Sequence, residues 1–320
     1  MNEYGLKEAI DEHMPFIDGL LQQSKIPIFN RFMHAAKIFV DVAIIDSSFE
    51  SQEEFLKSKA FFEGIIPLVN DWYWERYGEL SKNPTDKFYS GIITPYGQPV
   101  LVKIPATTSK VDVPNETVWF SLPDCLQKTE SIGDMIQTQI GLNKLPKEEM
   151  DKLSSEFSEV VSLTRSINLN MMTTTGLDQE TSNLLQGVWS HFEKSILDIL
   201  SFKNQQASIG CWELHLAIEK ALKVYLKQVS GNRMFGHDLK ALSSELNKYD
   251  HDLDLSIVRS LPSDKEAIKL RYSELITSVN DVVDYYKKAL ILVSVITSRY
   301  SRQYCFNNAS FLIKIAPWAR

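Results

Sequence analysis

The stretch that decides the fold is CWELHLAIEKALKVYLKQ at 211–228, followed by a short turn, GNRMFGHDL, at 231–239. Two glycines bound the turn, and Asp238 is placed to cap a second helix through its carboxylate. In the first part, apolar residues recur every three or four positions, the pattern of a helix with one buried face: Ile218, Ala221, Leu222 and Tyr225. The stretch therefore predicts two helices joined by a tight, polar turn.

The polar residues of the first helix have ordinary structural explanations. Glu219 and Lys223 are four positions apart and are expected to form an ion pair along the flank of the helix. His215 precedes Glu219 by one turn, so the two could face the same side, as metal ligands would. The sequence offers no evident third ligand. No metal and no other cofactor is predicted.

Arg233 and His237, both in the turn, are the candidate catalytic residues. An imidazole exchanges a proton near neutral pH, and a guanidinium offers paired donors to a phosphate. His237 would move a proton at the attacking 2'-hydroxyl or the leaving oxygen of RNA, while Arg233 would stabilise the charge on the phosphoryl group. The alternative is a structural role, in which His237 only forms a hydrogen bond with a neighbouring helix.

Three short motifs resemble the HEPN family (higher eukaryotes and prokaryotes nucleotide-binding). They are HLAIEKALKVYL at 215–226, GHDLKAL at 236–242 and LRYSEL at 270–275. The resemblance covers residues 180–300 approximately and rests on the order and spacing of the motifs. It implies a bundle of four to five helices that forms a homodimer.

The resemblance also implies a choice between two activities. Many HEPN proteins cleave RNA without a metal in a dimer cleft where an arginine and a histidine meet, and they occur in bacterial toxin–antitoxin and phage-defence systems. This would make Arg233 and His237 the catalytic pair of an endoribonuclease. The family's ribonucleases place the two residues farther apart, near the last long helix, whereas here Met234, Phe235 and Gly236 alone separate them.

The spacing favours the non-cleaving branch of the family, which binds a nucleotide, an RNA or a protein partner such as a nucleotidyltransferase. The phosphate contacts expected in that case are Arg233, Lys220, Lys223 and Arg271. The metal-independent endoribonuclease is the first alternative. A scaffold protein without catalysis is the second.

The charge of the chain differs between its two parts. Residues 1–180 carry 16 Lys and Arg against 27 Asp and Glu, a net charge of −11, while residues 181–320 carry 18 against 14, a net charge of +4. A basic second part would suit a polyanionic partner. The alternative is ordinary variation, because no dense run of Lys and Arg marks a phosphate track.

The cysteines and the apolar runs indicate an intracellular protein. Cys125, Cys211 and Cys305 lie far apart and are expected to be free thiols. The acidic N-terminal residues contain no apolar core of a secretory signal, and the longest apolar run is too short to cross a bilayer. A cytoplasmic protein without membrane contact is the expectation.

The chain as a whole predicts a mainly helical protein with two domains. Residues 1–176 are expected to form a helical domain of unknown function, and residues 177–320 the HEPN-like bundle. The polar segment NLNMMTTTG at 168–176 marks the boundary. Buried helical faces are predicted from the spacing of apolar residues in both domains: Phe32, Ala35, Ala36, Phe39, Val40 and Ala43 in the first, and Leu185, Val188, Phe192, Ile196 and Ile199 in the second.

The pattern changes to strands at residues 88–122. FYSGIIT at 88–94 and VLVKI at 100–104 flank a proline- and glycine-containing connection, which predicts a hairpin. TVWFSLP at 117–123 would complete a small antiparallel three-stranded meander packed on helices.

One long helix is predicted to begin near Asp264 with Ser263 as its cap. Apolar residues alternate in steps of four and three from Ile268 to Ile296, which gives four heptads. Burial inside the bundle explains this stripe, and a symmetric dimer is the alternative.

Two further candidates have structural alternatives. Arg31 and His34 lie about one turn apart on a predicted helix, where a position in or beside the core is the simpler explanation. The tail RYSRQY at 299–304 alternates arginine and tyrosine, which could stack on single-stranded bases or could simply end a helix.

Overall fold

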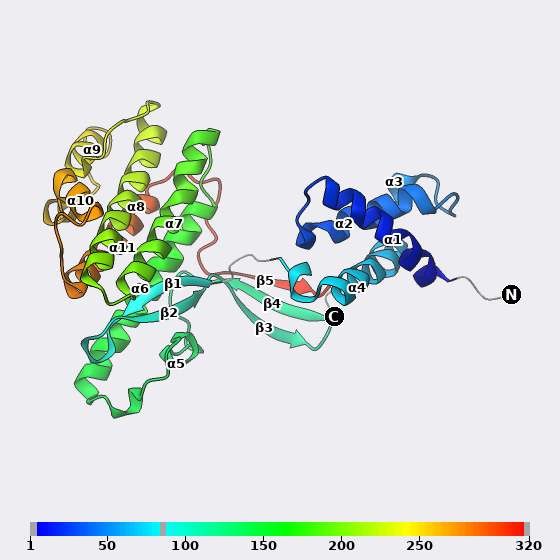
Figure 1. Ribbon diagram of the computed structural model, residues 1–320, viewed down its shortest axis with the longest axis horizontal. Coiled ribbons are helices and arrows are strands. Elements are labelled where there is room, and N and C mark those ends of the chain that lie inside the picture. Colours follow the sequence, from blue (N-terminus) through cyan, green and yellow to red (C-terminus); the bar gives the residue numbers. More distant parts are fainter. Residues whose placement is uncertain (1–4, 84–87, 317–320) are drawn as a thin grey trace. The chain divides into compact units, whose positions relative to one another are not determined.

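The computed structural model describes residues 5–83 and 88–316 and is mainly helical, with 61% helix, eleven α-helices in the described part and small antiparallel sheets (Figure 1). The chain divides into two compact units. The first takes residues up to 83 together with 110–119 and 312–316, and the second takes 88–109 and 120–311. The predicted boundary at 168–176 lies within the second unit. Its first residues, Asn168–Met172, form the end of a long helix of that unit.

The first unit is built from helices that precede residue 82. These are α1 (Leu6–Gln23), α2 (Ile28–Ala43), α3 (Gln52–Leu56), a π-helical segment (Ala60–Ile65), α4 (Ile66–Tyr77) and a 3-10 turn (Gly78–Ser81). The predicted face of α2 is confirmed, since Ala35, Ala36, Phe39 and Val40 are buried. Pro67 lies in the first turn of α4, directly after the π-helical segment.

A buried carboxylate joins three helices of this unit. Asp18 of α1 accepts hydrogen bonds from Arg31 of α2 (3.1 Å) and from the hydroxyls of Tyr73 (2.9 Å) and Tyr77 (2.5 Å) of α4. Burial opposes ionisation of Asp18, but these donors outweigh it and leave its pKa below the ordinary value. Tyr73 and Tyr77 of α4 thus have structural roles. Arg31 is in the core, while His34 faces away from it and is exposed.

The strands form two sheets. β1 (Phe88–Ile93) and β2 (Val100–Pro105) make the predicted hairpin, with Phe88 opposite Pro105 and Ile93 opposite Val100. The predicted three-stranded meander is wrong: β4 (Thr117–Leu122) pairs with β3 (Thr108–Val113) and with β5 (Ala309–Lys314), and not with β2. Residues 108–113 read TSKVDV, which is too polar to stand out as a strand, and β5 comes from the far end of the chain.

The second unit is one helical bundle with the β1–β2 hairpin packed against it (Figure 1). Its long helices are α6 (Lys147–Met172), α7 (Gln179–Ile199), α8 (Asn204–Ser230) and α11 (Val279–Ser298). The short helices are α5 (Ile132–Met135), α9 (Leu239–Leu246) and α10 (Asp264–Arg271), with 3-10 turns at Leu142–Lys144 and Ser256–Ser260. All five predicted apolar residues of α7 are buried, and Asp178 caps that helix.

The single long helix predicted from Asp264 is wrong. Ser263 does cap α10 in a capping box with Glu266, but α10 ends at Arg271. Ser273 then adopts a left-handed conformation (φ 57°), and Ser278 caps a new helix, α11. The apolar stripe continues through this break, so the sequence pattern gave no sign of it. Several residues of the stripe at or near the break are exposed and not buried: Ile268, Tyr272, Leu275 and Ile276.

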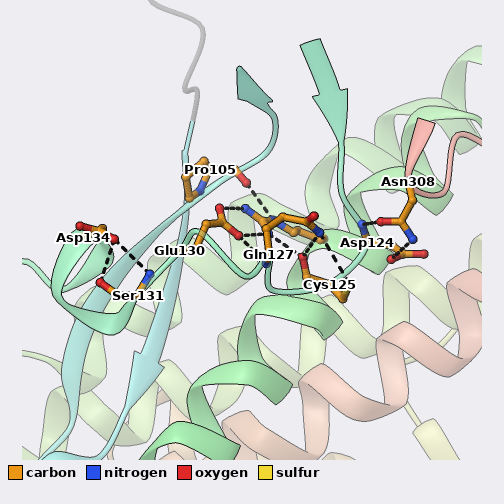
Figure 2. A network of polar contacts seen from close by, with 9 residues as sticks. Pro105, Asp124, Cys125, Gln127, Glu130, Ser131, Asp134 and Asn308 are labelled. Carbon is orange, nitrogen blue, oxygen red and sulfur yellow. Dashed lines mark hydrogen bonds and ion pairs between the residues drawn. The ribbon is translucent and has the colours of Figure 1, made fainter. Parts of the chain in front are cut away.

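A buried arginine fixes the loop between β4 and α6. Arg165 of α6 is 0% exposed and donates to both carboxylate oxygens of Glu130, to the carbonyl of Pro105 (3.1 Å) and to the carbonyl of Cys125 (2.7 Å). Figure 2 shows Pro105, Cys125 and Glu130 close together, with Asp124 bonded to Asn308 beside them. The end of β2 and the segment after β4 are thereby tied to the bundle.

Two expectations about side chains and membranes can be compared directly. Cys125 and Cys305 are exposed and Cys211 is buried, and all three are free thiols, as predicted. Within residues 5–83 and 88–316, no helix is both long and apolar enough to cross a membrane.

Candidate functional site

The candidate site lies where the turn after α8 folds back along that helix. Gly231 ends α8 in a left-handed conformation (φ 71°), which a residue with a Cβ rarely adopts. Asp238 then caps α9 by accepting hydrogen bonds from the amides of Lys240 (2.8 Å) and Ala241 (3.2 Å), as predicted. Two fixed helix ends therefore hold the turn that carries Arg233 and His237.

His237 is paired with a carboxylate of α8. Its Nδ1 lies 2.8 Å from Oε2 of Glu219, whose other oxygen accepts a hydrogen bond from Lys223 Nζ at 2.6 Å. The Glu219 side chain is 6% exposed and the His237 side chain 56% exposed. The predicted Glu219–Lys223 pair is confirmed. The sequence did not reveal that Glu219 also holds the imidazole, because the two residues are 18 positions apart.

His215 holds the same turn through its backbone. It is fully buried, and its Nε2 donates to the backbone carbonyl of His237 at 2.7 Å. Burial lowers the pKa of His215, which favours the neutral ring. Its Nδ1 has no hydrogen-bond partner among the described residues. His215 is thus a positioning residue for the backbone that carries His237. The contact of His237 with Glu219 of α8 is the hydrogen bond to a neighbouring helix that the structural alternative for His237 predicted.

An aromatic ring connects this turn to the end of α10. Trp212 stacks on His215 (ring centres 5.7 Å apart, planes 10° apart) and lies 6.2 Å from the His237 ring. The guanidinium carbon of Arg271 is 5.3 Å from the centre of the Trp212 ring and equally far from that of Tyr272. Tyr272 is 63% exposed. An arginine and a solvent-facing aromatic ring therefore lie beside the imidazole.

Arg233 has different partners from His237. Its guanidinium forms an ion pair with Glu180 at the start of α7 and lies over the ring of Phe235, 4.9 Å from the ring centre. Phe235 is 76% exposed. Arg233 also lines a small cavity together with Lys223 and Lys227. Lys223 therefore lies between the two candidate catalytic residues, and each of them is held by its own carboxylate.

Lys220 lies on another side of α8, against α7. A Cβ built on Gly187 would be 2.2 Å from Lys220 Nζ, so the end of the lysine side chain lies directly over this glycine of α7. Nearby, Glu213 of α8 bonds to His191 Nδ1 (2.7 Å) and to Lys194. Burial lowers the pKa of His191, and this outweighs the opposite effect of Glu213. The four predicted phosphate contacts thus divide, with Arg233, Lys223 and Arg271 around the turn and Lys220 beside α7.

The two arginines of the tail at 299–304 and its first tyrosine contact other parts of the bundle. Arg299 and Arg302 of the tail contact Asp250 (3.8 Å) and Asn170 (2.5 Å), and the buried Tyr300 hydroxyl donates to the carbonyl of Ala221 at 2.9 Å. In the part of the chain that the structure describes, no group of three His, Cys, Asp or Glu side chains could hold a metal ion.

The site can therefore do two things chemically. Its imidazole, oriented through Nδ1, has Nε2 available for a proton, and its exposed arginine–aromatic pairs offer charge and a stacking surface to a nucleotide. Comparison with protein-family models, with curated proteins and with solved structures found no match. The case for a function rests on this geometry.

Proposed function

We propose that the second unit is a HEPN-like bundle that binds single-stranded RNA through the turn at residues 231–239 and the end of α10. The observation that supports this best is the presence of two exposed arginine–aromatic pairs, Arg233 with Phe235 and Arg271 with Tyr272. Bases of single-stranded RNA stack on such rings, while the guanidinium groups attract the phosphates. Lys223 adds a donor beside Arg233, and His237 presents its Nε2 to a ligand.

The carboxylates of the site limit its affinity for phosphate. Glu180 holds Arg233 and Glu219 holds Lys223, so an incoming phosphate must compete with two ion pairs. We therefore expect stacking to supply most of the affinity and the dependence on salt to be shallow. This separates the proposal from a non-specific basic patch, whose affinity falls steeply with salt.

The binding experiment is fluorescence anisotropy with a labelled single-stranded RNA, run on the full chain. Tyr272→Ala and Phe235→Ala should each weaken binding about fivefold or more, since loss of one stacked base costs about 1–3 kcal/mol. Tyr249→Ala removes another exposed ring, over which no arginine of the described residues lies; it is the matched control and should leave the affinity unchanged. Equal affinities of all four proteins would refute the proposal.

A metal-independent endoribonuclease is the second candidate, and the Glu219–His237 pair favours it. A buried carboxylate that fixes one ring nitrogen leaves the other free to move a proton, as in other acid–base sites. The 2'-oxygen would attack phosphorus, the 5'-oxygen would leave with a proton, and a 2',3'-cyclic phosphate would remain. RNA incubated with the protein in EDTA should then be cut by wild type and not by His237→Ala. Intact RNA with the wild type removes this candidate and leaves the binding role.

A homodimer formed by the second unit belongs to the same proposal. Exposed apolar side chains other than Tyr272 gather near the site, on α10 and the loop after it: Ile268, Leu275 and Ile276. A second copy of the chain would bury such side chains and bring two turns together. Light scattering on the purified protein is the test: a mass of two chains supports a shared cleft, and a mass of one chain at tens of micromolar excludes it.

A further inference from the structure

Four consecutive apolar residues at the end of α2 lie outside the core of the first unit. They are Val42, Ala43, Ile44 and Ile45, and none of them is buried. Ile45 is 100% exposed and Val42 is 53% exposed. α2 ends at Ala43 and Ile44 is extended, so the two isoleucines belong to the connection between α2 and α3. An exposed apolar run is unfavourable in water, and in natural proteins it marks a surface that has a function.

A groove lies beside this run. It is bounded by the end of α2, the connection at 44–51 and the start of α3, and its volume is about 370 Å³. Ile44, Ile45, Phe49 and Phe55 supply its apolar lining. The ring centres of Phe49 and Phe55 are 5.2 Å apart, and Phe55 belongs to the core of the first unit. The groove, called here the α2–α3 groove, therefore has a packed base and a fully exposed isoleucine in its lining.

Every charged residue that lines the α2–α3 groove is acidic: Asp41, Asp46 and Glu50. Among the described residues, none of the three forms an ion pair. Asp41 accepts a hydrogen bond from Gln52, and Asp46 accepts one from the amide of Ser47. These neutral donors leave the negative charges in place. The lining thus presents three carboxylates to a ligand and no cation.

The charge decides which occupant suits the α2–α3 groove. Residues 41–56 include five Asp and Glu and no Lys, Arg or His, and residues 5–83 carry 13 Asp and Glu against 8 Lys and Arg, a net charge of −5. RNA, an anionic membrane and the same surface of a second copy would all be repelled. No group of three His, Cys, Asp or Glu side chains in the described residues could hold a metal ion. A cationic protein segment with apolar residues fits both the charge and the exposed isoleucine.

We propose that the α2–α3 groove binds a basic amphipathic segment of a partner protein. Lysine or arginine side chains of this segment meet Asp46 and Glu50, and an apolar side chain covers Ile45. The apolar contact supplies affinity, while the charges orient the segment and select against acidic partners. The proposal is independent of RNA binding, because it concerns the first unit alone.

The probe is a fluorescently labelled peptide built of leucine and lysine alone, in an order that gives an amphipathic helix. It should bind the full chain with a saturable rise in anisotropy. Its counterpart with glutamate in place of every lysine should not bind, and its counterpart with glutamine in place of every leucine should bind about tenfold more weakly. No binding of the leucine–lysine peptide contradicts the proposal. Equal affinity of the glutamine–lysine peptide also contradicts it, since charge alone would then explain the binding.

A pair of charge variants locates the peptide on the chain. Asp46→Asn combined with Glu50→Gln should weaken binding about fivefold, because it removes two carboxylates from the groove. Asp71→Asn combined with Glu75→Gln is the matched control, since it removes the same charge from exposed positions of α4 that do not line the groove. The control should change the affinity less than twofold. Equal losses in the two double variants would mean attraction to the whole acidic surface and overturn the proposal.

The apolar contact has its own pair of variants. Ile45→Ser should weaken binding about fivefold or more, because the peptide loses the exposed side chain that it covers. Leu80→Ser alters a residue that is 67% exposed and does not line the groove, and it should leave the affinity unchanged. Thermal unfolding should be the same for Ile45→Ser and the wild type, so that a lost affinity reports a lost contact. Equal affinities of Ile45→Ser and Leu80→Ser overturn the proposal.

Discussion

Oε2 of Glu219 lies 2.8 Å from Nδ1 of His237, and the carboxylate is almost completely buried while the imidazole is half exposed. The carboxylate thus lies inside the bundle, and the imidazole lies at its surface. Lys223, bonded to the other oxygen, balances the buried negative charge. The contact with Glu219 of α8 therefore fixes the orientation of the His237 ring before any ligand binds.

Glu219→Gln should destabilise the second unit. The neutral amide keeps the shape but loses two charge-assisted bonds, which are worth about 1.5–3 kcal/mol each when intact and are only partly replaced. We expect the free energy of unfolding to fall by about 2 kcal/mol in urea titrations. Glu245→Gln, which breaks the solvent-exposed pair with Lys248, is the control and should change it by less than about 1 kcal/mol. Equal costs would show that the carboxylate of Glu219 is not held as described.

Arg165→Met should be among the most destabilising substitutions in the chain. It leaves the carboxylate of Glu130 buried without its partner, a change that costs about 3–5 kcal/mol. Arg299→Met removes a longer and more exposed contact with Asp250 and should cost less than about 1 kcal/mol. Urea titrations of both variants measure their free energies of unfolding. A similar decrease in the two variants would contradict the prediction that Arg165 stabilises the fold more than Arg299 does.

The same pair predicts a dependence on acid. Burial raises the pKa of Glu130, but the bonds from Arg165 and from the amide of Gln127 outweigh it, so the folded-state pKa lies below the ordinary 4.5. The pair therefore stabilises the fold fully above that value, and its contribution is lost as pH falls through the folded-state pKa. The stability gap between wild type and Glu130→Gln should be widest at pH 6–7 and narrow below pH 4.5. A gap that widens in acid would reverse the sign and refute this account.

Tyr77→Phe should destabilise the first unit without affecting RNA binding. The hydroxyl donates to the buried carboxylate of Asp18 at 2.5 Å, and loss of a hydrogen bond to a charged group costs about 1.5–3 kcal/mol. Tyr249→Phe removes an exposed hydroxyl and should cost less than about 0.5 kcal/mol. Thermal unfolding measures the first effect, and anisotropy with RNA the second. A loss of RNA affinity in Tyr77→Phe would link the first unit to binding.

The break between α10 and α11 predicts local hydrogen exchange. Amides at 273–277 bond only within a turn or to the side chain of Ser208, so they should exchange faster than those in the buried middle of α11, residues 283–296. Ser278→Ala removes the cap of α11 and should cost about 1 kcal/mol. Ser244→Ala, at an exposed site inside α9, serves as its control. Uniform protection of the amides from 264 to 298 would contradict the break and favour a single helix.

Much of the helical structure followed from the sequence because its helices obey simple rules. The apolar faces of α2 and α7, the caps Ser263 and Asp238, and the β1–β2 hairpin all depend on residues a few positions apart. These local rules failed where the structure depends on distant pairing. β5 joins β4 across almost two hundred residues, and the polar β3 carries no alternation that would mark it.

The site was predictable only in part for the same reason. The Glu219–Lys223 pair is local and was found. The contact of Glu219 with His237, the support from His215 and the pairing of Arg233 with Glu180 all join separate segments, so residue types and spacing could not reveal them. The long apolar stripe also misled, since an uninterrupted pattern of three and four does not report a backbone that turns at Ser273.

Photo-crosslinking with an RNA that contains 4-thiouridine tests the central claim most directly, because it locates the RNA on the full chain by mass spectrometry of the crosslinked peptides. We predict crosslinks at Phe235 and Tyr272, on either side of His237, and their loss in the Phe235→Ala and Tyr272→Ala variants. Crosslinks confined to other surfaces, or none at RNA concentrations that saturate binding, would contradict the claim that this turn and the end of α10 are the RNA site.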